Sequence, residues 1–369
     1  MTEKEFSIIK GVYTSISKGN LKNLTHQRIR TIVKNQIPGT RVTQHRQRRL
    51  FTLLDAQWRI RFHPPSFGLN RIYFHFQLSR SSSLSKILGF SNPANTLLAT
   101  TIVYQDGKFD NYRGIIVLPT QIIGSMEKYL KNCEDKGQII IKELSKINDI
   151  QITHSLKLYV AEKGWRALKF AEYQNFLRNT KAQKEHTALS DNDLMLTSPF
   201  YTNWHFRQDS KYTKPTQFIE LFCNALPAFS YDELLHKDPS KRKEFRFSDS
   251  EFRLLKYLHD KNVLQLTFEP LQLMADFSLQ QFWIQPISSI SQDVLFNLIR
   301  YLPVTHVIST EKTKYIWTRL TPQFVKLLND DLNWDVTPLT IRYYGLTSQK
   351  SWYNQESEEW RRPLLLKNY

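Results

Sequence analysis

Residues 40–65 read TRVTQHRQRRLFTLLDAQWRIRFHPP, and two different periodicities follow each other in this stretch. The part near 41–57 divides into two sides at the 100° per residue of an α-helix, and a threonine at 40 or 43 can cap its start. The part from Trp58 to His63 alternates as a strand does and ends at two prolines. We therefore expect a helix followed directly by a strand.

The two sides of this expected helix differ in chemistry. Its apolar side carries Val42, Leu50, Leu53, Leu54 and Gln57. The opposite side suits base edges and phosphates, because Arg can bond guanine in bidentate fashion and Gln can do the same with adenine. With the arginines of the strand, the candidate DNA-binding residues are Arg41, Thr43, Gln44, His45, Arg48, Arg49, Thr52, Arg59 and Arg61. The alternative is that this charge run is a solvated helix face.

Two further helical patterns precede this stretch. Apolar residues mark one helix over about 3–17, and Leu24, Ile29, Ile32 and Val33 mark another. Three helices followed by a basic strand predict a winged helix-turn-helix domain whose third helix enters the major groove. The charge agrees with this prediction: the chain carries +17, and residues 1–66 hold 13 Lys and Arg against 3 Asp and Glu, a net of +10. Phosphate binding requires such local charge density.

The composition argues against several other classes. With 41% apolar and 13% aromatic residues the chain is expected to fold, and 369 residues suggest two or three domains. We expect no membrane span and no signal peptide, because no apolar run is long enough. Cys133 and Cys223 alone make neither a disulfide framework nor a metal site. We expect a cytoplasmic, nucleoid-associated protein.

Residues 67–150 show the order βαββαβ. Strands are expected at 71–78, 96–104, 112–118 and 139–147, with helices at 81–88 and from Pro119 to Gly137. This order predicts an α+β fold in which a ferredoxin-like sandwich packs helices on an antiparallel sheet.

The passage from the third helix into the first strand of this sandwich resembles a known family. The matching residues are Arg49-Leu50, Leu53-Leu54, Trp58-Arg59-Ile60, Phe62-His63-Pro64-Pro65 and Gly68-Leu69-Asn70-Arg71-Ile72. Together with the domain order, they resemble the Lrp/AsnC (feast/famine) transcription regulators over about 150 residues. The resemblance implies an archaeal-like, DNA-binding dimer, with a small molecule such as an amino acid as a possible effector. The long second half and the lack of a clear glycine-rich effector loop depart from the family.

The C-terminal half repeats the same order in altered form. Strands are expected at 275–287, 304–310, 314–320 and 334–343, with helices at 292–302 and from Thr321 onward. A similar short motif lies between the third strand and the following helix in both copies. It reads Leu118-Pro119-Thr120-Gln121 in the first copy and Leu320-Thr321-Pro322-Gln323 in the second. If the copies are real, the two sandwiches can pair inside one chain as a pseudo-dimer. The alternative is coincidence, since βαββαβ patterns are common.

These patterns divide the chain into six segments. We expect a winged helix-turn-helix (1–66), a ferredoxin-like domain (67–150), a partly helical linker (151–210), a degenerate winged-helix-like domain (211–270), a second ferredoxin-like domain (271–345) and a tail (346–369). The presumed recognition helix of the second copy begins Ser248-Asp249-Ser250-Glu251, which would repel phosphate.

No nucleotide-binding loop, metal-binding spacing or nucleophile motif is present in the sequence. We therefore expect no enzyme, no cofactor and no metal. The leading hypothesis is a regulator that reads double-stranded DNA, as a homodimer or an intramolecular pseudo-dimer. The alternatives are a nucleoid-associated DNA-binding protein, or an RNA-binding scaffold whose Tyr73, Phe74 and Phe76 stack bases on an open sheet face.

Overall fold

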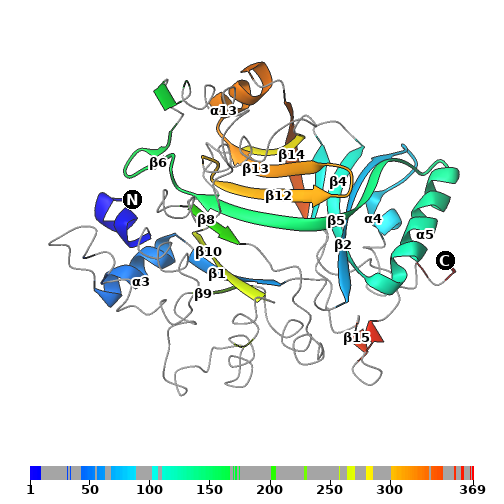
Figure 1. Ribbon diagram of the computed structural model, residues 1–369, viewed down its shortest axis with the longest axis horizontal. Coiled ribbons are helices and arrows are strands. Elements are labelled where there is room, and N and C mark those ends of the chain that lie inside the picture. Colours follow the sequence, from blue (N-terminus) through cyan, green and yellow to red (C-terminus); the bar gives the residue numbers. More distant parts are fainter. Residues whose placement is uncertain are drawn as a thin grey trace, which may run out of the picture.

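The structure is a computed structural model with mixed helices and antiparallel strands (Figure 1). It describes residues 1–9, 31, 34, 43–54, 56–62, 68–88, 102–106, 110–166, 169, 171–172, 174, 201–204, 228–230, 257, 264–270, 280–285, 301–331, 334–343, 353–354, 359–360, 366 and 368–369. Most of the segment expected as a linker, and most of the tail, lie outside these residues.

The first half of the chain builds four antiparallel strands in the order β3-β4-β2-β5. Their bounds are β2 (Leu69–Leu78), β3 (Ile102–Asp106), β4 (Asn111–Pro119) and β5 (Ile139–Ser155). Helix α4 (Leu84–Leu88) follows β2, and the 3-10 turn η3 (Thr120–Ile122) leads from β4 into α5 (Ile123–Asp135). The predicted element order βαββαβ is therefore confirmed.

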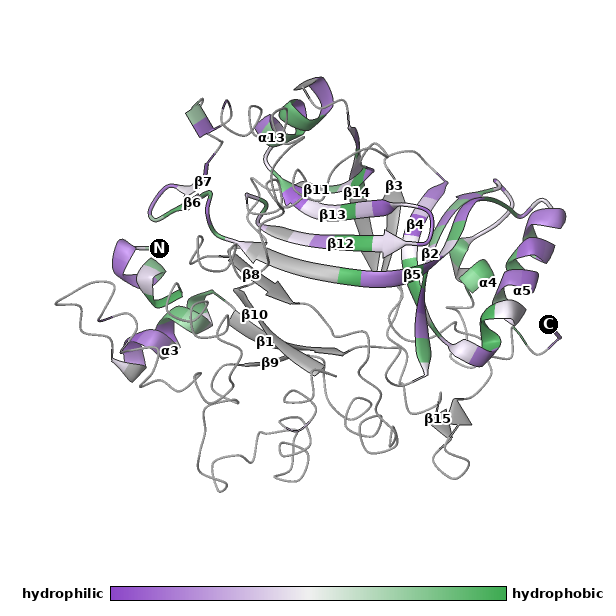
Figure 2. Ribbon diagram, in the orientation of Figure 1, coloured by the Kyte–Doolittle hydropathy of each residue, from purple (hydrophilic) through white to green (hydrophobic). Residues whose placement is uncertain are grey.

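One face of this sheet packs against α4 and α5. The side chains that meet there include Phe74 and Phe76 of β2 and Met126 and Leu130 of α5, all of them fully buried. Alternate strand residues share a face, and helix residues three or four apart share a side, so the sequence periodicity supplies both surfaces. Figure 2 shows α5 with hydrophobic and hydrophilic residues on different sides. The RNA-stacking alternative is wrong, because Tyr73, Phe74 and Phe76 are closed off from solvent.

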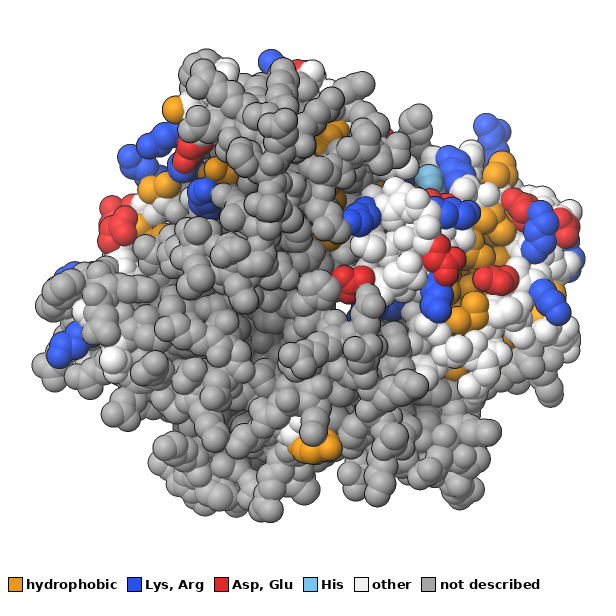
Figure 3. All heavy atoms as spheres, in the orientation of Figure 1, with side chains coloured by type: hydrophobic (Ala, Val, Ile, Leu, Met, Phe, Trp, Pro, Cys, Tyr) orange, Lys and Arg blue, Asp and Glu red, His pale blue; other side chains and the backbone are white. Residues whose placement is uncertain are grey.

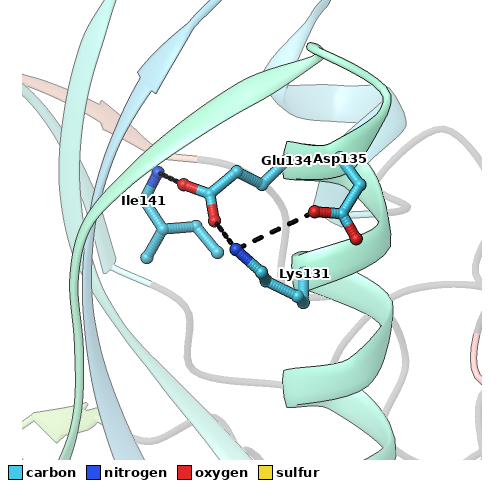
Figure 4. A network of polar contacts seen from close by, with 4 residues as sticks. All are labelled: Lys131, Glu134, Asp135 and Ile141. Carbon is cyan, nitrogen blue, oxygen red and sulfur yellow. Dashed lines mark hydrogen bonds and ion pairs between the residues drawn. The ribbon is translucent and has the colours of Figure 1, made fainter.

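Helix α5 is also tied to β5 by polar contacts (Figure 4). The Glu134 carboxylate accepts a hydrogen bond from the backbone N–H of Ile141 at 2.9 Å and pairs with Lys131 at 2.7 Å. These contacts hold the pKa of Glu134 below its usual range, because the Lys131 ammonium and the Ile141 amide both favour the charged form. The helix end is thereby fixed against the start of the strand.

The second half builds four more antiparallel strands, in the order β12-β13-β11-β14. Their bounds are β11 (Gln280–Gln285), β12 (Val304–Thr310), β13 (Lys314–Leu320) and β14 (Asp335–Tyr343). Between β13 and β14 lie α13 (Pro322–Lys326) and the π-helical turn η5 (Leu327–Asp331). Numbered along the chain, each set of four strands has the same order, 2-3-1-4.

The two sets of strands join along both edges. Strand β5 pairs with β12, and β14 pairs with β3, so that eight strands close into one antiparallel barrel. Register shifts in β5 opposite His75/Phe76 and Ser309/Thr310 let this long strand bend from β2 to β12. A further strand, β8 (Tyr201–Trp204), pairs with the end of β5.

The barrel interior has its own core, separate from the helix-facing cores of the two halves. It consists of Tyr73, Ile115, Ile147, Ile150, Trp283, Ile308 and Tyr315. The helix-facing core of the second half includes Phe282, Ile284, Ile316 and Phe324. Both faces of the strands are therefore covered, which explains why the sequence of these strands is rich in apolar residues on both faces.

A separate three-stranded sheet has the order β10-β1-β9. Its middle strand β1 (Ala56–Phe62) is the strand expected at Trp58–His63, and it pairs with β10 (Leu264–Pro270) and β9 (Ala228–Ser230). The strand was expected to be a wing that contacts DNA, whereas both of its backbone edges are paired with segments far along the chain. Local sequence cannot reveal such non-local pairing.

The N-terminal residues pack against the small hairpin of β6 (Tyr159–Val160) and β7 (Gly164–Trp165). Residues 3–9 are helical, and Thr2 and Glu5 bond each other's backbone N–H groups at 2.8 and 3.3 Å, which is a capping box. Phe6 contacts the ring of Tyr159 at 5.4 Å between centroids. The helix is thereby anchored at its first turn and by one buried aromatic side chain.

The C-terminal residues lie beside α5 (Figure 1). Leu366 is fully buried in the helix-facing core of the first half, and Tyr369 meets the ring of Tyr129 edge-on at 5.3 Å. Asn132 of α5 donates a hydrogen bond to the Tyr369 hydroxyl. A short hairpin, β15 (Tyr353–Asn354) with β16 (Glu359–Trp360), precedes this contact.

Candidate functional site

The candidate DNA-binding residues lie on α3 (Gln44–Leu53) and β1. Thr43 caps the helix by accepting a hydrogen bond from the Arg46 amide at 3.2 Å, and the side chains of His45, Arg49 and Thr52 are exposed. Arg41 lies outside the described residues, and so do the side chains of Gln44, Arg48, Arg59 and Arg61. The structure thus describes only part of the predicted polar side of this helix, and its role as a DNA-binding surface stays a prediction.

The apolar side of α3 differs from the expectation in three described residues, because Gln47 and Phe51 are buried and Leu53 is not. The buried positions are Gln47, Leu50, Phe51 and Leu54, whereas Leu53 is 61% exposed. Spacings of three, one and three residues place the buried four in one stripe, and Leu53 falls about 110° away from its centre. The helix also ends at Leu53 and β1 starts at Ala56, so the expected helix end near Gln57 is too late.

Basic side chains are not gathered on the described part of the face seen in Figure 3. Lys and Arg stand there among Asp and Glu, over the flank that carries α5 and the start of β5. The described residues contain no group of three or more His, Cys, Asp and Glu that could hold a metal ion. They also contain no helix that is long and apolar enough to cross a membrane.

A polar cluster lies inside the barrel, on three neighbouring strands. His75 of β2 stands directly opposite Arg113 of β4 on one side and Glu143 of β5 on the other. His75 and Arg113 are each two residues from a residue of the barrel core, Tyr73 and Ile115, so they face the interior as well. We call His75, Arg113, Glu143 and the hydroxyl of Tyr315 the polar layer.

Tyr315 reaches the polar layer from the other half of the chain. Its hydroxyl donates a hydrogen bond to Oε2 of Glu143, and the Ser145 hydroxyl donates to Oε1 at 2.9 Å. Burial raises the pKa of Tyr315 far above its usual range, and the bond to Glu143 acts in the same direction. The nearby Arg113 guanidinium acts on the pKa of Tyr315 in the opposite direction. Tyr315 is therefore a neutral donor and Glu143 its acceptor.

An aromatic layer lies next to the polar layer and consists of Tyr73 and Trp283. Their rings stack with centroids 5.3 Å apart and planes 11° apart, and Tyr315 contacts them at 4.6 and 5.3 Å. These three are the largest fully buried side chains among the described residues. The indole N–H of Trp283 is buried there and has no acceptor among the described residues, which is costly for a donor removed from water.

Sequence reasoning did not single out the polar layer. A signal was present, because His75, Arg113 and Glu143 lie in strands that are rich in apolar residues: RIYFHFQL, NYRGIIVL and IIIKELSK. A charged residue in such a strand is seldom buried unless it is paired or functional. What the sequence could not supply was the register that aligns the three residues and the barrel closure that adds Tyr315.

The fold and the site define a mixed α/β protein with a closed antiparallel barrel. No family model matches the chain, and no curated protein matches it. Among solved structures it is similar to the crystal structure of the siroheme decarboxylase NirDL, with 11% identity and a TM-score of 0.40, over 94% of this chain and 96% of that chain. The same enzyme in co-complex with an iron-uroporphyrin III analogue gives 11% identity and a TM-score of 0.39, over 94% and 95%.

These neighbours correct two predictions. The chain was predicted to be a DNA-binding regulator and not an enzyme, whereas both neighbours are enzymes, so we withdraw both predictions. A likeness of this strength assigns no reaction to the chain.

Proposed function

We propose that the protein is a single-chain pseudo-dimer that binds a small acidic molecule at the polar layer of its barrel. The observation that carries the proposal is the buried indole N–H of Trp283, which has no acceptor among the described residues. A ligand oxygen would supply that acceptor. An eight-stranded barrel has room for side chains or for one small ligand, and barrel ends are frequent binding sites.

Two register patterns support the pseudo-dimer. The two halves have equivalent strand orders, and each lends an edge strand to the other, β12 to β5 and β3 to β14. Strands β1 and β10 pair about Ile60↔Leu266, with Trp58 opposite Phe268 and Phe62 opposite Leu264. This is the pairing that two copies of one strand make about a two-fold axis.

The polar layer supports the acidic ligand. Arg113 supplies a positive charge that is only 6% exposed, and a carboxylate is the group that a guanidinium recognises best in a site of low dielectric constant. His75 and the Trp283 indole add donors on the same side of the sheet. The nearby Tyr73 and Trp283 rings favour a ligand with a flat apolar body.

The proposal is tested by thermal unfolding of the full chain with acetate, succinate or benzoate, and with benzyl alcohol as the uncharged control. A ligand that binds the folded state raises the unfolding temperature in proportion to the logarithm of its concentration. We expect at least one acid to stabilise the protein and benzyl alcohol not to do so. If no acid stabilises the protein, the proposal is wrong.

Matched variants locate the site. Trp283→Phe keeps the ring but removes the N–H, and we expect about fivefold weaker binding from the loss of about 1 kcal/mol. Trp334→Phe is its control, because Trp334 is buried on the helix-facing side of the second half. Arg113→Gln should weaken binding at least tenfold. Arg71→Gln should not, because Arg71 lies opposite Val117 of β4, four residues along that strand from Arg113. Equal effects within either pair would contradict the assignment.

A larger acid provides the opposite control. Iron-uroporphyrin III carries carboxylates but is too large for the interior of an eight-stranded barrel. We therefore expect Arg113→Gln and Trp283→Phe to leave any affinity for this larger acid unchanged. If both variants weaken its binding, the site admits a much larger acid and the proposal of a small ligand inside the barrel fails.

A further inference from the structure

We propose that the ligand of the barrel carries a hydroxyl group besides its carboxylate, and that Glu143 is the residue that selects this hydroxyl. The inference rests on the proposed function and adds the ligand's second group. It also assigns the selection to one half of the pseudo-dimer. Two observations support it: the hydrogen bonds that Glu143 accepts, and the different surroundings of Asp335, the equivalent carboxylate in the second half.

The equivalent positions follow from the strand registers. The shared motif after β4 and β13 aligns Leu118 with Leu320, so Arg113 corresponds to Tyr315 and Ile115 to Trp317. Tyr73 pairs with Ile115 and Trp283 with Trp317, so those two also correspond. The next positions give the remaining pairs: His75 with Gln285, Glu143 with Asp335, and Ser145 with Thr337.

One local contact, between a hydroxyl and a carboxylate two residues apart, occurs in both halves. The Ser145 hydroxyl donates to Glu143 at 2.9 Å, and the Thr337 hydroxyl lies 3.4 Å from the Asp335 carboxylate. In each half, a carboxylate near the start of a strand accepts from the hydroxyl two residues further on. The second contact is longer, at the weak limit of a hydrogen bond.

The surroundings of the two carboxylates differ. Glu143 is half-buried and receives Tyr315 from the other half, whereas Asp335 and its neighbour Gln285 are exposed. The position equivalent to Tyr315 is Arg113, so the layer holds one buried guanidinium and not two. The barrel therefore presents one asymmetric centre, in which a positive group and a fixed carboxylate flank His75.

This asymmetry determines what the centre can bind. A carboxylate has about four acceptor positions, and Tyr315 and Ser145 use one on each oxygen. A bare organic acid faces repulsion from Glu143 even though Arg113 attracts it. A hydroxy acid offsets that repulsion, because its hydroxyl donates to Glu143 while its own carboxylate meets Trp283 and Arg113. Sites that hydrogen-bond a hydroxyl discriminate strongly against analogues that lack it.

The test measures the affinity of the full chain for benzoate, for 3- and 4-hydroxybenzoate and for their methyl ethers, by titration calorimetry. We expect one hydroxybenzoate to bind at least tenfold more tightly than benzoate, with one ligand per chain, and its methyl ether to lose that gain. Glu143→Gln should reduce the gain at least fivefold and strengthen benzoate binding, because the negative charge is removed. Asp335→Asn, the equivalent change in the second half, should leave every affinity within twofold.

Each outcome decides between the two proposals. If benzoate binds but neither hydroxybenzoate gains over it, or if Glu143→Gln and Asp335→Asn act alike, this inference is wrong and the proposed function stands. Two ligands per chain would also overturn it. If no acid binds the wild-type protein, both proposals fail. Because Glu143→Gln could disturb folding, Ser145→Ala with Thr337→Ala as its counterpart provides a second matched pair, for which we expect the same asymmetry.

Discussion

At the scale of single residues, charge is placed where a specific partner stabilises it. The clearest case outside the barrel is Glu172. Its carboxylate accepts hydrogen bonds from both terminal nitrogens of Arg166 at 2.6 and 2.8 Å and from the backbone N–H of Lys169 at 2.9 Å. The bonds from Arg166 are the main reason why the pKa of Glu172 falls to about 2. Bidentate pairs of this kind are among the stronger ion pairs in proteins.

The first prediction is the pH dependence that Glu172 adds to stability. Its pKa is lowered in the folded state, so its contribution is present above the ordinary glutamate pKa of 4.5 and is lost as the pH falls toward about 2. We expect Glu172→Gln to reduce the free energy of unfolding at pH 7 by up to about 3 kcal/mol and to flatten its slope between those limits. Denaturant unfolding at several pH values measures this. Glu311→Gln, on an exposed turn, is the control, and an equal slope in both variants would contradict the prediction.

The second prediction concerns Tyr315. Its burial and its bond to Glu143 keep the hydroxyl protonated above the usual tyrosine range. Because the pKa is raised in the folded state, this contribution to stability is present below pH 10 and is lost as the pH rises above it. We expect Tyr315→Phe to leave the tyrosinate absorbance of the folded protein unchanged up to the pH of unfolding. A loss of one ionising tyrosine below that point would show that Tyr315 is accessible to solvent.

At the scale of elements, the C-terminal residues complete the core of the first half. Leu366 is fully buried against the sheet and helices, whereas Leu53 of α3 is largely exposed. We predict that Leu366→Ala costs about 2–4 kcal/mol of the free energy of unfolding, because it leaves a cavity in a close-packed core. Leu53→Ala should cost less than about 0.5 kcal/mol. Similar values for the two variants in denaturant unfolding would mean that the C-terminal contact does not form.

Elements with strong local signals could be predicted from the sequence, and their non-local partners could not. The strands at 304–310 and 314–320 have the predicted bounds, because alternation and turn residues mark them on both sides. Strand β3 is described from Ile102, and residues 96–101 of the predicted strand lie outside the described residues. Strand β5 runs on to Ser155, where pairing with β12 sustains it beyond the predicted end at 147. The partners of β1 and the polar layer depend on register between distant segments, which local patterns do not encode.

At the scale of the whole molecule, the edges that would otherwise pair with a second copy are used within the chain. Strands β3, β5, β12 and β14 close the barrel, and unpaired edges are what drive strand addition between chains. We predict that the protein is a monomer of 43.8 kDa in solution, rather than a homodimer. Light scattering after size exclusion measures this over a range of concentrations. A dimer that persists on dilution would contradict the prediction.

The arrangement of the whole molecule also gives part of the basic N-terminal segment a structural role. The net charge of +10 over residues 1–66 remains a property of the sequence, but β1 within it is the middle strand of a sheet that joins distant parts of the chain. The chemistry that the described residues bring together lies inside the barrel, where both halves contribute. We therefore expect an acidic ligand to bind to this layer.

A crystal structure of the protein grown with benzoate tests this expectation. We predict that one benzoate lies in the barrel, with a carboxylate oxygen within about 3.2 Å of the Trp283 indole nitrogen and its charge toward Arg113. Benzoate bound elsewhere while Trp283 and Arg113 keep their packing, or an empty barrel at saturating benzoate, would contradict the claim.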